Sequence, residues 1–513
     1  MGFESLDYVV ILLYLLAIVG ISVFFMKGQK DTADYFLGGR RFHWFPIAIS
    51  MYATVFSAIS FISSPGRAYN KGMTMYLYSI FAVLGALLGV KIFVPFFRRL
   101  SLTTAYEYLE YRFNLGIRLL ASFLFLMLRV FYLGVVLYAT AVALEPFTGW
   151  SYSFSIVIVG VIATLYTALG GMKTVVWTDV VQFAILLGGI LLVVFMLGRA
   201  HPDGFTGIWQ YARSEGHTFN EVAEARFYRF DPFVTTFWGI FIFSVFTKLG
   251  YASADQSSIQ RYLSTRNEKD ASRSFFVGAL LSIPVQFLLY FAGLGLLYFY
   301  ATYPQKALPD MAGDHALARF ISTELPAGVK GLLMAAILAA VMSTVDSVLN
   351  SLSACTVTDF VRRVFRPHAT EQYYLRYARI ATVAWGIVAI ASAICIVALY
   401  GDLKKNPLMT VSNATVGFFI GILLAVFLLG ILTKRANPTG VFAGTGAGLV
   451  AVLVVTSLFY FRDLPEGSPQ LSFTWITIVG CFVTLVVGYG VSLLTPPPAI
   501  EKIERFTYWH LRG

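Results

Sequence analysis

The most regular feature of the sequence is a succession of long apolar segments separated by shorter polar ones. A helix that spans a membrane needs about 20 mostly apolar residues, and thirteen segments meet that length. The pattern therefore predicts an all-α integral membrane protein, in which the longest connections, near 199–232 and 303–328, cover one face. The predicted helices are 8–26, 44–63, 74–97, 119–144, 152–171, 175–198, 233–254, 274–303, 329–354, 376–400, 409–432, 438–461 and 472–494.

Two of these segments lose their apolar character along their length. Segment 44–69 is rich in Ser, Thr and Ala and carries Pro46 and Pro65 near its ends. Segment 233–262 changes character at the run Thr247-Lys248-Leu249-Gly250. Each segment opens a block of five predicted helices, the second to sixth and the seventh to eleventh. Interrupted helices at matching places in two halves are typical of transporters built from inverted repeats.

The composition fits a chain that is solvated largely by lipid. Of 513 residues, 58% are hydrophobic and 13% are charged, whereas a soluble domain carries roughly 25% charged residues. The formal net charge of +11 does not indicate a nucleic-acid partner, because the basic residues form short clusters between apolar segments and no continuous face. In a membrane protein such clusters set the orientation, since Lys and Arg gather in cytoplasmic loops.

Alternate connections carry these basic clusters, whereas the N-terminus holds Glu4 and Asp7. We therefore expect a multi-pass protein of the cell (cytoplasmic) membrane, with its N-terminus outside and its C-terminus inside. The clusters follow the first, third, seventh, ninth and eleventh predicted helices: Lys27, Lys30, Arg40 and Arg41; Arg98, Arg99, Arg112 and Arg118; Arg261, Arg266, Lys269 and Arg273; Arg362, Arg363 and Arg366; Lys434 and Arg435.

The cysteines and histidines form no catalytic or metal-binding motif. Cys355, Cys395 and Cys481 fall within or beside apolar segments, and their spacing matches neither a zinc site nor a disulfide framework. The six histidines form no HExxH motif, and the sequence contains no glycine-rich phosphate loop and no GxSxG motif. Transport is therefore the predicted function, rather than catalysis by a membrane enzyme. A passive channel is a further alternative, which uphill accumulation of a solute would exclude.

Among the ionisable residues within or close to the predicted membrane helices, six are singled out, because such residues are rare in membranes and by default functional. They are Lys91, Arg129, Asp179, Lys248, Asp255 and Asp346. Lys91 is placed to extend its ammonium group toward the membrane surface, and Asp255 is near a helix end. Asp179 is a candidate cation ligand, and its structural alternative is a salt bridge to Arg129 or Lys248.

Segment 331–360 combines small and hydroxyl-bearing residues with a carboxylate. The residues that share one helical face, at positions i, i+3, i+4 and i+7, are Ala340, Ser343, Thr344 and Ser347. Asp346 and Asn350 border that face. A stripe of small residues alone would indicate close helix packing. The carboxylate favours a cation site, because a buried unpaired charge is unfavourable and hard cations prefer oxygen ligands.

Several runs of the sequence resemble the sodium/solute symporter family, which includes sodium-coupled sugar, sialic acid, iodide, multivitamin and monocarboxylate transporters. The runs are AYEYLEYRF (105–113), YTALGGMKTVVWTDVVQF (166–183), ADQSSIQRYLSTRNEKDA (254–271), MSTVDSVLNS (342–351) and LAVFLLGILTKRANPTG (424–440). The resemblance covers almost the whole chain and implies sodium-coupled import of a small polar solute by alternating access. It implies a single transmembrane domain, 1–513, with a five-plus-five inverted-repeat fold: an extra first helix at 8–26, repeats at 44–198 and 233–432, and two extra helices at 438–494.

The resemblance also implies two sites for sodium, the expected coupling ion. The main site would use the backbone carbonyls of Ala53, Phe56 and Ala340 and the hydroxyls of Ser343 and Thr344. A second site, present in some members, maps to Asp179, Ser343, Asp346 and Ser347. The family usually has Ser or Thr at the position of Asp346, so the added carboxylate either strengthens the second site or makes it proton-sensitive. The number of sodium ions per solute stays open.

The positions that contact the solute in the family map to Ser57, Ser60, Ser79, Lys248 and Asn413. The arginine that binds the substrate carboxylate in sialic acid members aligns with Tyr132, and Arg129 lies one turn away. Tyr251 aligns with an aromatic gate.

Lys248 favours an anionic solute, such as a carboxylate or an acidic sugar. Sugar members carry an amide at this position and a carboxylate at the position of Ser79. The alternative is that Lys248 pairs permanently with Asp179 or Asp346, which would leave a site for a neutral sugar. In either case the expected partners are a small solute and membrane lipid, with no nucleic acid, and the chain is expected to function as a monomer.

Overall fold

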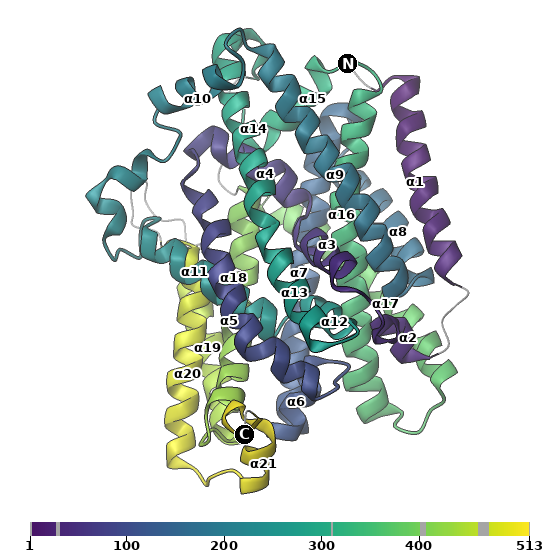
Figure 1. Cartoon of the computed structure of the whole chain (residues 1–513), viewed down its shortest axis with the longest axis vertical. Helices are drawn as coiled ribbons and strands as arrows, with labels where there is room; N and C mark the ends of the chain where they lie inside the picture. Colours follow the sequence, from purple (N-terminus) through teal and green to yellow (C-terminus); the bar gives the residue numbers. More distant parts are fainter. Residues whose placement is uncertain (1–2, 27–30, 309–310, 401–406, 460–470, 512–513) are drawn as a thin grey trace.

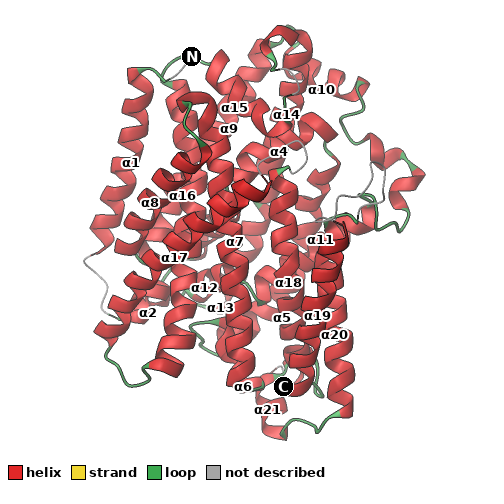
Figure 2. Ribbon diagram, turned by 180° about the vertical axis from the view of Figure 1, so that it is seen from behind, coloured by secondary structure: helices red, strands yellow, loops and turns green. Residues whose placement is uncertain are grey.

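The protein is a bundle of long helices (Figure 1). The computed structural model describes residues 3–26, 31–308, 311–400, 407–459 and 471–511. Over these ranges there is no β-sheet (Figure 2), and an isolated parallel bridge pairs Phe42 with Thr265. The chain begins at one end of the bundle and finishes at the other. These ends are called the N-terminal side and the C-terminal side below.

The helices of the first half are α1 (Ser5–Met26), α2 (Thr32–Leu37), η1 (Gly38–Arg40), α3 (Trp44–Val55), α4 (Ala58–Lys71), η2 (Thr74–Tyr76), α5 (Leu77–Arg99), α6 (Ala105–Arg112), α7 (Leu115–Thr148), α8 (Tyr152–Leu169), α9 (Met172–Ala200), α10 (Gly204–Ser214), η3 (Asn220–Ala223) and η4 (Ala225–Tyr228). Those of the second half are α11 (Phe237–Ser253), α12 (Gln256–Leu263), α13 (Glu268–Leu280), α14 (Ser282–Thr302), η5 (Pro304–Lys306), α15 (Gly313–Glu324), α16 (Val329–Cys355), the π-helical η6 (Thr356–Phe365), α17 (Glu371–Tyr400), α18 (Leu408–Leu432), α19 (Pro438–Phe459), α20 (Thr474–Leu494), α21 (Ile500–Phe506) and α22 (Tyr508–Leu511).

The predicted all-helical membrane architecture is confirmed. Within the described ranges, 11 helices are long and apolar enough to cross a membrane. Two further pairs pass the same test jointly but are bent, α3 with α4 by 62° and α11 with α12 by 56°. Counting each bent pair as one span gives up to 13 spans.

The first bent pair lies where the sequence predicts an interrupted helix. α3 ends at Val55, and the next two residues have extended backbone: Phe56 at φ −82°, ψ 93° and Ser57 at φ −102°, ψ 176°. Extended residues do not continue the ladder of helical hydrogen bonds, so backbone carbonyls at the break are available to other partners.

The second break lies further along the chain than the loss of apolar character suggests. The run 247–250 is helical and belongs to α11, whereas the chain bends at Ala254 and Asp255. Asp255 starts the new helix there, because its carboxylate accepts a hydrogen bond from the Ser258 backbone N–H at 3.2 Å. The polar run within α11 therefore does not mark the break. Its residue Lys248 lines a cavity that is described in the next subsection.

α16 lies at the centre of the bundle. In its most apolar stretch 94% of the residues are buried, compared with 17% in α1 at the periphery. The first turn of α16 is capped from α1: the Asp7 carboxylate accepts hydrogen bonds from the backbone N–H groups of Gly328 and Gly331, each at 2.7 Å. This contact ties the first helix of the chain to the central one.

The two ends of the bundle differ in character. The long connections contribute α10 and α15 to the N-terminal side (Figure 1), as predicted. On the C-terminal side, basic side chains tie neighbouring segments together through backbone carbonyls. Arg40 donates to the carbonyl of Leu102 at 2.7 Å, and Arg98 donates to that of Thr265 at 2.6 Å.

Candidate cation and solute sites

The first break faces α16 and gathers oxygen atoms. The Ser343 hydroxyl donates to the carbonyls of Ala53 at 3.1 Å and Ala340 at 3.2 Å. The Thr344 hydroxyl lies 3.2 Å from the carbonyls of both Thr54 and Ala340. Two hydroxyls and three carbonyls from two helices therefore meet in one buried place.

This cluster fits the requirements of a sodium ion. Phe56, the fifth residue predicted for the main site, lies within the break, three residues after Ala53. Unwound backbone carbonyls together with side-chain oxygens are the groups with which broken membrane helices coordinate Na⁺. The structure thus brings four of the five predicted residues into direct contact and puts the fifth beside them.

A second cluster lies along the same helix and contains two carboxylates. Asp346 is 1% exposed. Its oxygens accept from Ser347 at 3.2 Å, Tyr166 at 3.3 Å and Thr178 at 3.5 Å, all of them long contacts. Among the described residues, no Lys, Arg or His lies within ion-pair distance of this carboxylate.

The other carboxylate, Asp179, is paired with Arg261. The guanidinium lies 3.2 Å from Oδ2 of Asp179 and also contacts the Ser347 hydroxyl. Ser50 completes the cluster, since it donates to Asp179 at 2.5 Å and accepts from Arg261 at 2.8 Å. The expected alternative of a salt bridge from Asp179 to Arg129 or Lys248 is therefore wrong.

Arg261 is the main residue that sequence reasoning missed, since it was assigned to a basic cytoplasmic loop. It lies instead in α12, where all eight residues are buried. The run QSSIQRYL contains no Gly or Pro, and this absence is the signal that could have indicated a helix.

A cavity of about 160 Å³ lies between the two bent pairs. It is lined by seven of the eight residues predicted to contact the solute: Ser57, Ser60, Ser79, Tyr132, Lys248, Tyr251 and Asn413. This space is called the central cavity below. Tyr52 also lines it, and its hydroxyl is a buried polar atom without a hydrogen-bond partner in the described part of the chain. Such an atom is available to a bound molecule.

Arg129, the eighth predicted residue, does not line the central cavity. It forms an ion pair of 2.5 Å with Asp255. Its guanidinium lies 5.3 Å from the ring centre of Tyr132 and 5.7 Å from that of Tyr251. Arg129 therefore supports the aromatic wall from behind, and its charge is balanced by a carboxylate.

The positive charge of Lys248, by contrast, is not balanced by a paired carboxylate among the described residues. Among the described residues that line the central cavity, Lys248 is the single one with a charge. Its ammonium group lies 4.8 Å from the ring centre of Phe275 and has no carboxylate within ion-pair distance. In this structure Lys248 is thus paired with neither Asp179 nor Asp346. Its position on the cavity wall explains why α11 is polar at this point.

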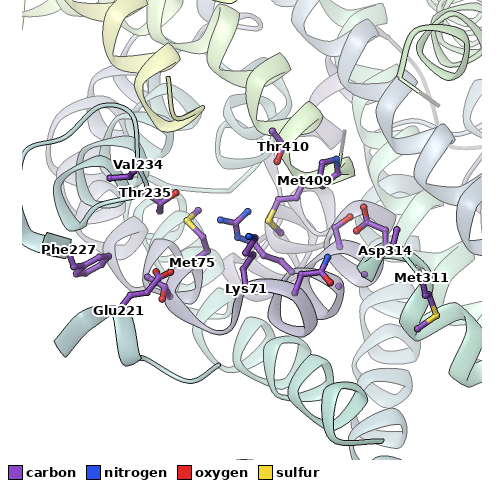
Figure 3. A pocket seen from close by; sticks show the side chains of 18 of the residues that line it. Lys71, Met75, Glu221, Phe227, Val234, Thr235, Met311, Asp314, Met409 and Thr410 are labelled. Carbon is purple, nitrogen blue, oxygen red and sulfur yellow. The ribbon is translucent and has the colours of Figure 1, made fainter. Parts of the chain in front are cut away.

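A larger cavity of about 850 Å³, called the vestibule below, lies toward the N-terminal side, next to the end of α4 and the first turns of α15 and α18. Met75 and Met409 line both the vestibule and the central cavity, so the two spaces adjoin at these side chains. Figure 3 shows both methionines together with Lys71 in this cavity.

The remaining ionisable and polar residues of interest serve the fold. Lys91 is exposed on α5, as expected for a lysine that extends toward the membrane surface. Asn350 accepts a hydrogen bond from Gln260 at 2.7 Å, which joins α16 to α12. Among the described residues, no group of three or more His, Cys, Asp and Glu could hold a metal ion.

Comparison with known proteins gives a consistent result. Residues 35–448 match the model of the sodium:solute symporter family. The chain is 30% identical to a sodium/sialic acid symporter of Proteus mirabilis, with 96% of both chains covered. It is 32% identical to a sodium-dependent multivitamin transporter of rabbit (Oryctolagus cuniculus), over 99% of this chain and 80% of the relative. A solved substrate-bound, outward-open structure of a Na⁺-coupled sialic acid symporter superposes with a TM-score of 0.87, at 29% identity and with 97% and 99% of the two chains covered.

Proposed function

The chain belongs to the sodium:solute symporter family, and from this premise we propose that it imports a small solute with a carboxylate group together with sodium. Sodium-coupled symport is the activity of the family. The observation that carries the choice of an anion is the unpaired Lys248 on the wall of the central cavity. Relatives named for sialic acid and for monocarboxylates act on solutes of this chemical class.

Lys248 is suited to select a negative charge. A carboxylate that entered the cavity would meet a single fixed positive charge with no competing carboxylate on the wall. A charge-assisted hydrogen bond contributes about 1.5–3 kcal/mol. A neutral solute would leave the ammonium group without this partner.

The size of the central cavity favours a small solute. Its volume is about 160 Å³, whereas pockets for drug-sized ligands occupy roughly 300–1,000 Å³. A monocarboxylate fits this space directly, and a larger acidic sugar requires the walls to move apart.

The second cation cluster decides whether transport moves a net charge across the membrane. One sodium ion and one singly charged anion cross the membrane as a neutral pair, so the membrane potential does not drive their accumulation. A second sodium ion at Asp179, Ser343, Asp346 and Ser347 would add one net positive charge. Moving that charge across about 100 mV is worth about 2.3 kcal/mol, or roughly fiftyfold accumulation.

Basic residues on the C-terminal side support a cytoplasmic position for that side and an extracellular position for the vestibule. The bent pairs support repeats at 44–198 and 233–432, with extra helices at 8–26 and 438–494. We propose a multi-pass protein of the cytoplasmic membrane that is surrounded by lipid, acts as a monomer and has no enzymatic activity.

Uptake into proteoliposomes tests the proposal. Purified protein would be reconstituted and given an inward sodium gradient with radiolabelled lactate, sialic acid or glucose. We expect sodium-dependent uphill uptake of at least one of the acids and none of glucose. Uptake of glucose alone would contradict the anionic assignment, and solute flux without uphill accumulation would indicate a passive channel.

A further inference from the structure

The first helix of the chain contributes a polar group to the interior of the bundle. α1 packs against α9 and α16, and Tyr14 on its inner face is 6% exposed. The Tyr14 hydroxyl donates to the sulfur of Met342 at 3.5 Å and accepts from Nε2 of Gln182 at 3.4 Å. Gln182 follows Asp179 by three residues, and Met342 precedes Asp346 by four. Tyr14 therefore contacts the helical turns that adjoin both carboxylates of the second cation cluster.

Two oxygen atoms on α9 have no hydrogen-bond partner among the described residues, Oδ1 of Asp179 and Oε1 of Gln182. The two side chains are 0% and 1% exposed, and Arg261 is paired with the other oxygen of Asp179. Residues three apart are neighbours on one face of a helix, so these side chains lie side by side. Both oxygens can accept but cannot donate. What complements them is therefore a cation or a water molecule.

The charge of the cluster favours a cation. Asp179 and Asp346 contribute two negative charges when ionised, and Arg261 contributes one positive charge. The excess negative charge belongs to Asp346, whose side-chain partners among the described residues are hydroxyl groups. A buried charge without a counter-charge is costly. One monovalent cation balances it, and hard cations prefer oxygen ligands.

We propose that Tyr14 and Gln182 extend the second cation cluster into a sodium site between α1, α9 and α16. The Tyr14 hydroxyl, Oε1 of Gln182, Oδ1 of Asp179 and the Asp346 carboxylate hold the ion. The first helix, which lies outside both proposed repeats, thus takes part in cation binding. The binding of sodium rests on the cluster alone, whereas its coupling to a solute rests on the proposed function. The competing explanation is a buried water molecule, with Tyr14 and Gln182 serving to join α1 to the bundle.

Equilibrium binding of radioactive sodium to the detergent-purified protein tests the site without any solute. Choline chloride would keep the ionic strength constant. Thr344→Ala would be the background, because it weakens the main cation site and leaves the four proposed ligands in place. In this background we expect Tyr14→Phe and Gln182→Met to raise the dissociation constant for sodium by roughly 3- to 10-fold each, since each removes one oxygen ligand.

Tyr300→Phe is the matched control, since Tyr300 is a buried tyrosine of α14 whose hydroxyl donates to the Ala316 carbonyl of α15 at 3.1 Å. It removes a hydrogen bond between helices and should leave the dissociation constant unchanged. Gln182→Glu keeps an oxygen ligand and adds a negative charge, so it should bind sodium at least as tightly as the background does.

An unchanged dissociation constant in either Tyr14→Phe or Gln182→Met would overturn the site, as would an equal loss of affinity in Gln182→Glu and Gln182→Met. The water explanation predicts the first of these results. If Gln182→Met elutes as an aggregate, Tyr14→Phe decides the question, because it removes a single oxygen atom and keeps the ring.

Reversal potentials test whether this ion is coupled to transport. In proteoliposomes given lactate or sialic acid at low sodium concentration, Tyr14→Phe and Gln182→Met should move fewer sodium ions per solute than the wild type. Tyr300→Phe should keep the ratio of the wild type. Weakened sodium binding with an unchanged ratio would overturn the coupling role. If neither acid enters with sodium, the proposed function fails, whereas the binding measurement still decides the site.

Discussion

The guanidinium of Arg261 lies 3.2 Å from the carboxylate of Asp179, and this ion pair joins α12 of the second half to α9 of the first. Both side chains are almost fully buried. The same guanidinium contacts Ser347, which donates to Asp346. One arginine therefore connects both carboxylates of the second cation cluster, although it pairs with only one of them.

Removal of Arg261 should destabilise the protein strongly. Breaking a buried ion pair by removing one partner costs about 3–5 kcal/mol, because the other charge is left uncompensated. We expect Arg261→Gln to lower the melting temperature of the detergent-purified protein and Asp179→Asn in the same chain to restore part of the loss. Arg363→Gln, at an exposed arginine paired with Glu110, should have an effect within about 1 kcal/mol. A double variant that melts no higher than Arg261→Gln alone would contradict this account.

The hydroxyls of the main cation site are expected to govern the affinity for sodium. Ser343→Ala/Thr344→Ala removes both hydroxyls and leaves the backbone of α16 unchanged. The sodium concentration for half-maximal uptake should rise roughly tenfold or more. Ser353→Ala is the control, because Ser353 is a buried serine of the same helix that donates to the Ala378 carbonyl at 2.8 Å. An unchanged sodium dependence in the double variant would exclude this site.

The two carboxylates should determine the coupling ratio. If Asp179 and Asp346 hold a second sodium ion, Asp179→Asn or Asp346→Asn should reduce the number of sodium ions moved per solute. Reversal potentials measured on proteoliposomes report this ratio directly. With an anionic solute the wild type should be electrogenic and the variants electroneutral. Equal ratios in all three proteins would leave the two carboxylates with a structural role.

Lys248→Gln tests the choice of an anion at the central cavity. Loss of a charge-assisted contact worth about 1.5–3 kcal/mol should raise the half-saturation concentration for an acid by roughly 10- to 150-fold. A neutral analogue should be unaffected. Lys91→Gln, at an exposed lysine of α5 outside the cavity, serves as the control and should behave as the wild type. Equal losses for acid and neutral solutes would indicate a general defect.

The stability of the folded protein should depend on pH through Asp314, which lines the vestibule. Burial raises the pKa of this carboxyl above its ordinary value of 3.8. The folded protein therefore binds the proton more tightly than the unfolded chain does, so stability falls as the pH rises from the ordinary pKa through the raised one. Asp314→Asn keeps an oxygen acceptor for Leu408 and carries no charge at any pH. Its advantage in melting temperature over the wild type should grow as the pH rises above 3.8 and level off once the pH exceeds the raised pKa.

A pH-independent difference for Asp314→Asn would show that this carboxyl does not titrate differently in the folded and unfolded states.

The positions of the membrane helices along the chain could be predicted from the sequence, because each segment that crosses a lipid bilayer needs about 20 mostly apolar residues. The break at Phe56 was also accessible, since a Ser- and Thr-rich stretch between two prolines is unusual in an apolar helix. The second break was placed too early, at 247–250. A polar residue that lines a cavity and a polar residue at a helix end look alike in sequence, and Lys248 is of the first kind.

The ion pairs could not be predicted in the same way. Hydropathy does not distinguish a buried polar helix from a loop, so Arg261 was assigned to the cytoplasm. Each buried charge had several candidate partners, and the choice depends on how helices distant in sequence are rotated toward one another. Arg129 illustrates this dependence. It lies one helical turn from Tyr132 on α7, as expected, yet its side chain pairs with Asp255 and does not line the central cavity.

The cap that Asp7 provides for α16 has a consequence for biogenesis. Asp7 and Gly328 are 321 residues apart. At about 5–20 residues per second, ribosomes complete Gly328 roughly 16–64 s after Asp7. During that interval α1 must remain in the bilayer without its partner, which its almost uninterrupted apolar surface allows. The hydrogen bond from Gly328 to Asp7 can thus form only after most of the described helices have been synthesised.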